Sequence, residues 1–528
     1  MASLPSSTSR PPTDVLSSRI SREAAGWGCT HWANPADEYE EGATRRGAKR
    51  KQFSWISPKP LWESRNDKIA RWLGDSTLHE RMRWVEAQRR RGVDPNLPIR
   101  TYEDKEKVAF MVLGDPGEGD DSQYQVLRPL RATSSDTNFT FIVSDVIYPA
   151  GDWHEYRAKF YWPYKGLPGP IYAIPGNHDW YDGLSGFMML LCGADPDLRP
   201  PFRASRSRLK RAFRDLTWRE PTEAQQEQLD KIKEHRSEPS GQRLPYFAIE
   251  LKELVLVGID TGIQSGLDAE QGEWLREISR GPKDKILLTG KPLVVDARRK
   301  TCPIAGGGTV NSIVDDPDNR YVAVIGGDIH NFQRYPVRLP GDRVIQHIVT
   351  GAAGAYTKAT HRIPTATIAS CGCTEKDFRC YPRRGDSLAA YSMLLNKRLP
   401  FDLAIDPELT PEVMGQLLGN AVAPRRAEDR GKAASADALA KAKRVVFFSD
   451  SKILGPLSKN FSEFLDWNES PPPLFKSFLR VETGPGEIQI RCFGVTGCEK
   501  HADSPPLEDH IRGTKVGDGR WNWEVLLD

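Results

Sequence analysis

The chain has 528 residues, of which 38% are hydrophobic and 27% are charged, and its formal net charge is +3. This near balance argues against a nucleic-acid-binding protein driven by overall charge, and the length allows two or three domains. No stretch reaches the roughly 20 apolar residues that a membrane-spanning helix needs, and the first residues lack the apolar core of a signal peptide. We therefore expect a cytoplasmic protein with no membrane partner, and the oligomeric state stays open.

The N-terminal part of the chain predicts two regions. Residues 1–51 mix Ser, Pro, Arg and Gly without periodicity, which predicts a disordered basic arm. This arm is either a solvated tail or a segment that binds phosphate or nucleic acid. Residues 52–104 carry aromatic and aliphatic side chains at helical spacing, with Arg and Glu between them, and predict a helical N-terminal extension. We expect the aromatic side chains to pack this extension rather than to bind a cofactor.

The main core is predicted over residues 105–360, where apolar runs repeatedly end in polar residues. Three runs start near residues 108, 137 and 171, and the polar residues after them are Asp115, Asp145, Tyr148, Asn177 and His178. The carboxylates and the amide are 30 and 32 residues apart, the length of a βαβ unit, so crossovers would set the strands side by side. The polar ends then converge, and carboxylates held so close favour a bound cation.

A later strand, at residues 321–325, leads into Gly-Gly-Asp-Ile-His, with Asp328 and His330 two positions apart. Residues i and i+2 at a strand end point to one side, so both can face one cation or straddle a pair of cations. Before this strand, residues 184–243 predict a basic, helical insertion. The insertion either caps the site and attracts phosphate or forms a solvated helical pair.

Beyond the core, residues 361–443 predict a mixed helical and linker region. Residues 444–528 predict a small β-rich C-terminal region packed on or beside the core, with a hairpin that turns at 484–486. The eight cysteines are too sparse for a disulfide framework. A zinc ion could be held by Cys371, Cys373 and Cys380, with His361 upstream, although no second Cys-x-x-Cys pair completes the usual spacing of a structural zinc site.

The ordered motifs resemble those of the calcineurin-like metallophosphoesterases. They are Gly-Asp-Pro-Gly at Asp115, Ser-Asp-x-x-Tyr at Asp145 and Tyr148, Gly-Asn-His-Asp at Asn177, Asp-Thr-Gly at Asp260 and Gly-Asp-x-His at Asp328. Their order and spacing match over residues 107–356, and the Tyr most resembles the purple acid phosphatase branch. The resemblance implies an α/β (α+β) fold, a four-layer α/β/β/α sandwich, with helical and β-rich additions at its ends.

For function, the resemblance implies metal-dependent hydrolysis of a small phosphorylated substrate, either a phosphomonoester or a phosphodiester. It implies a centre of two divalent or mixed-valence metal ions, of Mn, Fe or Zn, and hydrolysis by a hydroxide that bridges them. A nuclease of the same superfamily is one alternative, although the near-neutral chain argues mildly against it. A phosphoesterase-like binding or scaffold module that has lost turnover is the alternative from another class.

Carried over residue by residue, the resemblance also implies individual roles. The first ion would be held by Asp115, Tyr148 and His330, the bridging ligand would be Asp145, and a ligand of the second ion would be Asn177. His178 would stand beside the phosphate, to stabilise the transition state or protonate the leaving oxygen.

This chain departs from the family pattern around the second ion. Gly290-Lys291-Pro292 stands where the family usually has His-x-Pro, and Asp328 stands where it usually has a histidine. The second site therefore loses one imidazole and exchanges another for a carboxylate, which predicts weaker binding and a preference for a harder cation. Lys291 either supplies the missing positive charge or, together with Arg334, binds the phosphate of the substrate.

Overall fold

The structure is a computed structural model of the chain. It describes residues 58–195, 224–233, 238–295, 298–355, 373, 379–381, 476–495, 497, 499–517 and 519–527. Several predictions fall outside these residues, namely the basic arm at 1–51, nearly all of the region at 361–443, and Cys371 and His361 of the predicted zinc site. Among the described residues, every helix is too short or too polar to cross a membrane.

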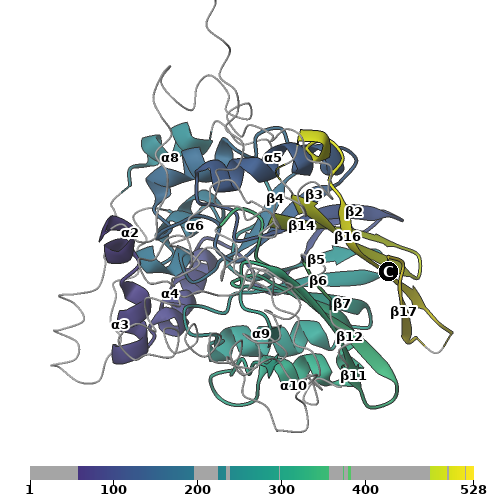
Figure 1. Ribbon diagram of the computed structural model, residues 1–528. Coiled ribbons are helices and arrows are strands. Elements are labelled where there is room, and N and C mark those ends of the chain that lie inside the picture. Colours follow the sequence, from purple (N-terminus) through teal and green to yellow (C-terminus); the bar gives the residue numbers. More distant parts are fainter. Residues whose placement is uncertain are drawn as a thin grey trace, which may run out of the picture.

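Two β-sheets lie face to face at the centre of the described residues (Figure 1). The larger sheet has the strand order β1-β5-β6-β7-β10-β12-β11-β13. Its strands are β1 (Ile99–Tyr102), β5 (Phe247–Leu251), β6 (Leu254–Ile259), β7 (Asp284–Thr289), β10 (Tyr321–Gly326), β11 (Phe332–Leu339), β12 (Arg343–Thr350) and β13 (Arg379–Tyr381).

The smaller sheet has the strand order β17-β16-β15-β14-β2-β3-β4. Its strands are β2 (Val108–Gly114), β3 (Phe139–Val143), β4 (Ile171–Ile174), β14 (Lys476–Gly484), β15 (Glu487–Val495), β16 (Leu507–Lys515) and β17 (Trp521–Val525). A separate pair of short strands is formed by β8 (Val294–Val295) and β9 (Arg298–Arg299).

Helices cover the outer faces of both sheets. They are α2 (Pro58–Glu63), α3 (Asn66–Leu73), α4 (Thr77–Arg90), α5 (Asp121–Ser134), α6 (Ser185–Leu190), α8 (Gln226–Lys233), α9 (Ala269–Ser279) and α10 (Val310–Asp315). Short helical turns are η2 (Trp153–Glu155), η3 (Arg157–Tyr161), η4 (Asp179–Asp182), η6 (Pro317–Asn319) and η9 (Glu499–His501). α5 and α6 pack on the smaller sheet, whereas α9 and α10 pack on the larger one.

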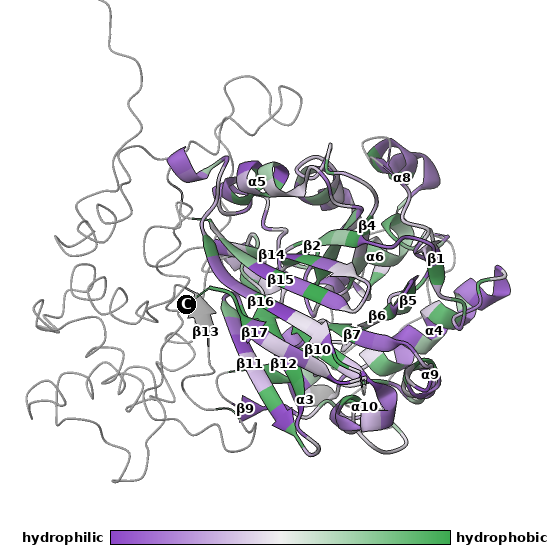
Figure 2. Ribbon diagram, turned by 90° about the vertical axis from the view of Figure 1, so that its right-hand side faces the viewer, coloured by the Kyte–Doolittle hydropathy of each residue, from purple (hydrophilic) through white to green (hydrophobic). Residues whose placement is uncertain are grey.

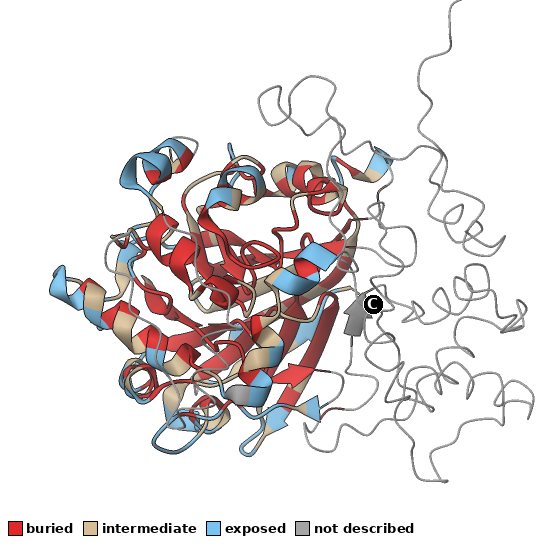
Figure 3. Cartoon of the chain, turned by 90° about the vertical axis from the view of Figure 1, so that its left-hand side faces the viewer, coloured by how far each residue is buried: buried red, intermediate tan, exposed pale blue. Residues whose placement is uncertain are grey.

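The central strands, such as β2, are apolar because both of their faces are covered. In β2, Phe110 and Val112 lie between the two sheets, while Met111 and Leu113 pack against helices of the outer layer. Alternate side chains of a strand point to opposite faces, so a strand buried on both sides must be apolar at every position. Figure 2 shows α8 as a largely hydrophilic helix, and Figure 3 shows buried strands inside an exposed rim. The predicted four-layer α/β/β/α sandwich is confirmed.

The three predicted core strands do lie side by side. β2 pairs with β3 and β3 pairs with β4, both in parallel, so their carboxyl ends share one edge. In the larger sheet, β7 and β10 are also parallel neighbours. Polar residues that follow these five strands can therefore meet between the two sheets.

Strands from outside the predicted core complete both sheets. β14 pairs with β2 in antiparallel fashion, and β15, β16 and β17 follow it outward, so the C-terminal residues continue the smaller sheet. β1, from the predicted N-terminal extension, pairs with the edge strand β5. Strands of the predicted N-terminal extension and of the predicted C-terminal region therefore belong to the same two sheets as the core strands. The hairpin predicted at 484–486 is present between β14 and β15.

The predicted insertion at 184–243 includes a buried helix at its start. All six residues of α6 are buried, so this helix belongs to the core rather than to a solvated insertion. Farther along, α8 buries only Leu229 and Ile232 on an otherwise polar helix. The basic run between these helices lies outside the described residues.

Candidate functional site

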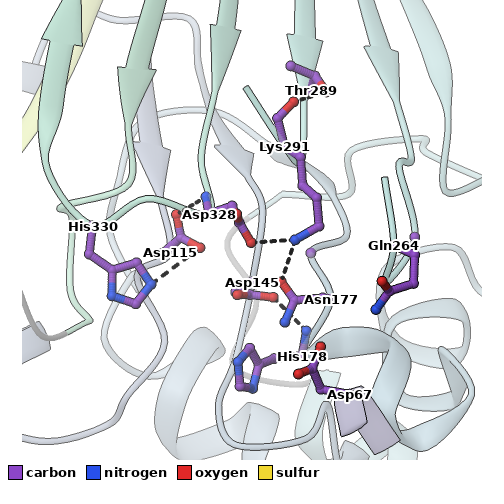
Figure 4. A network of polar contacts seen from close by, with 12 residues as sticks. Asp67, Asp115, Asp145, Asn177, His178, Gln264, Thr289, Lys291, Asp328 and His330 are labelled. Atoms are coloured by element: carbon purple, nitrogen blue, oxygen red, sulfur yellow. Dashed lines mark hydrogen bonds and ion pairs between the residues drawn. The ribbon is translucent and has the colours of Figure 1, made fainter. Parts of the chain in front are cut away.

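Polar residues from five strand ends gather at one place between the sheets (Figure 4). They follow β2, β3 and β4 of the smaller sheet and β7 and β10 of the larger one, and they are Asp115, Asp145, Asn177, His178, Lys291, Asp328 and His330, with Tyr148 in contact with Asp115 and His330. The convergence of Asp115, Asp145 and Asn177 that the sequence predicted is therefore present, and the larger sheet contributes to it as well.

The first group of side chains joins Asp115, Tyr148 and His330. The Tyr148 hydroxyl lies 3.2 Å from Asp115 Oδ1 and 3.1 Å from His330 Nε2, and these two atoms are 3.9 Å apart. All three side chains are buried, with exposed fractions of at most 5%. Two oxygen atoms and one imidazole nitrogen, drawn from three strand ends, thus surround one point. This is a donor set that suits a transition-metal ion.

The backbone near these residues is unusual. Asp115 and Asp328 have φ angles of 54° and 64°, in the left-handed region of backbone conformation that residues other than glycine seldom adopt. The Asp328 N–H donates to Asp115 Oδ2 over 2.8 Å, which fixes the end of β10 against the end of β2. Such backbone conformations persist where the surrounding structure enforces them, and they concentrate at functional sites.

The second group of side chains surrounds the Lys291 ammonium. Lys291 Nζ lies 2.6 Å from Asp328 Oδ1 and 3.3 Å from Asn177 Oδ1. The Asn177 amide nitrogen donates to Tyr181 Oη over 2.7 Å, which turns its oxygen toward the ammonium. Burial by itself lowers the pKa of Lys291, but the nearby carboxylates of Asp328, Asp145 and Asp67 outweigh it, so the pKa is raised. The side chain therefore carries a positive charge at neutral pH.

Asp145 and His178 lie between these two groups. Asp145 Oδ1 accepts a hydrogen bond from the His178 backbone N–H over 2.7 Å. A side chain at Gly176 would place its Cβ 2.1 Å from the same oxygen, so only glycine allows the loop after β4 to approach this carboxylate. The Gly in Gly-Asn-His-Asp is thus required by the position of Asp145.

His178 has a defined tautomer. Its Nδ1 is 2.7 Å from the Pro149 carbonyl oxygen, which can only accept, so Nδ1 carries a proton and donates it. The protonation of the ring can then change only at Nε2. The imidazole also packs against the Tyr148 ring, with a centroid distance of 4.6 Å. The tyrosine therefore contacts the predicted acid-base residue on one side and Asp115 on the other.

Several residues that support the site were not identified from the sequence. The Asp179 carboxylate accepts hydrogen bonds from Val146 N and Gly176 N over 2.9 and 3.0 Å, and so fixes the loops after β3 and β4. Burial, and then the charge of Asp145, raise the pKa of Asp179 well above its usual range. The signal for this residue was present as the last letter of Gly-Asn-His-Asp.

The rim of the site includes two further residues that were not predicted. Asp67, on α3 of the N-terminal region, and Gln264 lie beside His178, Asn177 and Lys291 (Figure 4). Nothing in the local sequence around Asp67 marks it as a site residue, because only the packing of α3 brings it there.

The predicted role of Arg334 in binding substrate is wrong. Its guanidinium is 2% exposed and forms an ion pair with Asp509 of β16, with an Nε to Oδ2 distance of 2.5 Å. Arg334 lies on β11 and Asp509 on a strand of the other sheet, so the pair joins the two sheets. A buried arginine already bound to a carboxylate is not available to a phosphate group.

The residues present fit a metal ion at one position better than at a second. Asp115, Tyr148 and His330, with Asp145 close by, offer buried oxygen and nitrogen donors. At the second position Asn177 and Asp328 both contact an ammonium group, and Gly290 offers no side chain. Within the part of the chain that the structure describes, no three His, Cys, Asp or Glu side chains gather as a metal-binding group, and the first donor set includes the phenol of Tyr148.

A comparison with protein-family models agrees with this arrangement. A sequence model described as calcineurin-like phosphoesterase matches residues 108–332, which include every residue of the cluster. None of the curated protein sequences matches the chain significantly.

Among solved structures, the chain is similar to purple acid phosphatase PPD1 from yellow lupin (Lupinus luteus) seeds, at 8% identity and a TM-score of 0.38, over 78% of this chain and 54% of that one. It is also similar to PhoD, at 8% identity and a TM-score of 0.37, over 82% and 73% of the two chains. A third similar structure is GAP50, the anchor in the inner membrane complex of Plasmodium, at 11% identity and a TM-score of 0.29, over 48% and 74%.

The chain thus spans about half the length of PPD1, the first of these. The match of the family over residues 108–332 coincides with the strands and strand ends that build the cluster. Residues 108–332 form a calcineurin-like phosphoesterase domain.

Proposed function

We propose that this protein is a metal-dependent hydrolase of phosphate esters. The observation that carries the proposal is the convergence of Asp115, Asp145 and Asn177, from the smaller sheet, with His330 from the larger one. Their placement at strand ends, with buried carboxylates beside an imidazole and a phenol, suits a cation and an anionic substrate together. The match to the phosphoesterase family supports the same conclusion.

The metal-binding residues in this proposal are Asp115, Tyr148, His330 and Asp145. A divalent or trivalent ion of Mn, Fe or Zn, held there, would act as a Lewis acid toward the phosphoryl oxygen and lower the pKa of water. In the net reaction the oxygen of water forms a bond to phosphorus, the ester P–O bond breaks, and the leaving oxygen takes up a proton.

His178 is the residue that would give this proton. Its Nδ1 donates to the Pro149 carbonyl, so Nε2 is the nitrogen at which a proton is gained or lost. The hydrogen bond also holds the ring in one orientation, as a general acid requires. The positive charge of Lys291 would offset negative charge on the phosphoryl group. The substrate class that follows is a small phosphomonoester or phosphodiester.

The first experiment compares hydrolysis of p-nitrophenyl phosphate and bis-p-nitrophenyl phosphate, with Mn2+ supplied, by the natural protein and its Asp145→Asn variant. Asparagine keeps the shape of the side chain and an oxygen that can accept from His178 N, but removes the charge. We expect kcat to fall by a factor of about 100 or more, the usual cost of removing one electrostatic partner from an active site.

The control is Asp230→Asn, at an exposed aspartate of α8, which should leave the rate unchanged. The preferred ester distinguishes a monoesterase from a diesterase. Failure of the metal-bound natural protein to hydrolyse either ester would contradict the proposal and favour the binding or scaffold module.

A further inference from the structure

The Lys291 ammonium occupies the place where the side chains of three strand ends meet. Asn177 follows β4, Lys291 follows β7 and Asp328 follows β10, and the oxygens of the first and last lie 3.3 and 2.6 Å from Lys291 Nζ (Figure 4). A cation at this point would use the same two oxygens as ligands. The lysine therefore takes both donors that a second metal ion would need.

The lysine is also held firmly in this place. The hydroxyl of Thr289, the last residue of β7, donates to the Lys291 carbonyl oxygen over 2.9 Å and fixes the turn from which the side chain extends. The Lys291 and Asp328 side chains are only 19% and 24% exposed, so water screens their attraction weakly. An ion pair in this setting is retained more strongly than one on an open surface.

The backbone beside Lys291 excludes a further ligand. A Cβ atom at Gly290 would lie 2.9 Å from the Pro175 carbonyl oxygen and 3.0 Å from Thr261 Oγ1. Because the first contact is with backbone, an imidazole at this position would require the loop after β4 or the loop after β7 to move. The packing around Gly290 therefore leaves no room for a ligand side chain at this position. Replacing Gly290 alone by histidine would not restore the ligand unless one of these loops also moved.

We propose that the Lys291 ammonium replaces the second metal ion, so that each chain holds one metal ion, at Asp115, Asp145, Tyr148 and His330, beside a fixed lysine charge. This inference rests on the proposed function for the identity of the first ion. Lys291 and a divalent cation cannot share Asn177 and Asp328, because like charges this close repel each other. Asp328 serves as the partner of Lys291 rather than as a metal ligand.

The test is the metal content of the natural protein and of its Lys291→Met variant. Methionine has a similar length but no charge, so it leaves Asn177 and Asp328 available to a cation. Each protein is saturated with Mn2+, freed of unbound metal by gel filtration, and analysed by mass spectrometry. Electron paramagnetic resonance then distinguishes isolated Mn2+ ions from spin-coupled pairs. We expect one isolated ion per chain in the natural protein, and two coupled ions in the variant.

The matched control is Lys283→Met. Lys283 precedes β7 at its other end and forms an ion pair with Glu250 over 2.8 Å, so the control removes a paired lysine far from the cluster. It should keep one ion per chain. Circular dichroism and thermal unfolding show whether each variant is folded. If a variant does not fold, the number of Mn2+ ions in the natural protein still tests the proposal.

Two coupled ions in the natural protein would overturn the inference, and so would a single ion in folded Lys291→Met. One ion per chain without hydrolysis of either ester would leave the inference standing and contradict the proposed function. Two coupled ions in a natural protein that hydrolyses one of the esters would overturn the inference and support the proposed function. A natural protein that binds no Mn2+ would overturn both.

Discussion

At the scale of single residues, burial determines which protonation state the fold can accept, and His347 illustrates this away from the site. It lies on β12, between Tyr335 of β11 and Val324 of β10, and is 1% exposed. Neither ring nitrogen has a hydrogen-bond partner among the described residues. Burial, and then the charge of Arg299, lower the pKa of His347 to about 3.

We predict that His347 makes the protein less stable in acid. In the unfolded chain the imidazole titrates near pH 6.5, whereas the folded protein resists protonation down to about pH 3. Between these values the unfolded state binds the proton and the folded state does not, so unfolding is favoured as pH falls. The contribution of His347 to the free energy of unfolding is fully present above pH 6.5. Within this window it falls by about 1.4 kcal/mol for each unit by which the pH decreases.

Urea unfolding of the natural protein and of His347→Leu between pH 7 and pH 4 measures this contribution. The variant should lose stability less steeply than the natural protein over this range. Replacement of the exposed His154 by Gln should leave the slope as it is. Equal slopes for the natural protein and His347→Leu would contradict the prediction.

At the scale of elements, α4 fastens the N-terminal region to the core. Arg81 of α4 lies 2.7 Å from Asp260, which follows β6, and 2.8 Å from Asp268, which caps α9. Asp260 also accepts a hydrogen bond from Trp180 Nε1 of η4 over 3.0 Å. Burial alone would lower the pKa of Arg81, but the two carboxylates raise it overall, so the guanidinium stays charged. The Asp-Thr-Gly motif therefore has a structural role in joining these elements.

We predict that Arg81→Met strongly destabilises the protein. The substitution would leave Asp260 and Asp268 buried without their cation, and removal of one partner from a buried ion pair costs about 3–5 kcal/mol. Thermal or urea unfolding measures the loss.

The control is Arg90→Met on the same helix. Arg90 is 76% exposed and pairs with Glu86, so its loss should cost less than about 1 kcal/mol. Similar stabilities of the two variants would show that the buried pair does not stabilise the attachment of α4.

At the scale of the whole molecule, the last strands complete the sandwich. β14 covers the edge of β2, the strand that Asp115 follows, through pairs such as Leu479 with Val112. Leu479 and Val481 of β14, with Ile488 and Ile490 of β15, belong to the apolar layer between the two sheets. The segment that follows residue 475 is thus needed for the same core that positions the site.

We predict that a chain ending at residue 475 does not fold. It would expose the edge of β2 and lose apolar side chains from between the sheets, which favours aggregation. A chain ending at residue 517 lacks only β17, an edge strand with largely exposed side chains, and should still fold. Circular dichroism and size-exclusion chromatography compare the two. A compact chain ending at 475 with the circular dichroism of the full chain would contradict this prediction.

The sequence by itself determined the core strands and the residues at their ends. Apolar runs and the polar residues that stop them are local features, so the sequence predicted β2, β3, β4 and β10 and placed Asp115, Asp145, Asn177 and His330 at their ends. Parallel pairing brings such ends together, which is why their convergence was predictable.

Only the tertiary structure decided which partners these side chains have. Arg334 was expected at the substrate, but Asp509, 175 positions away, binds it. Lys291 meets Asp328 and Asn177, and Arg81 meets Asp260, through packing between segments that carry no mutual signal in the sequence. Strand periodicity extends over a few residues, whereas an ion pair depends on where whole sheets and helices come to rest. For the same reason, the sequence could not assign β14–β17 to the sheet that carries Asp115.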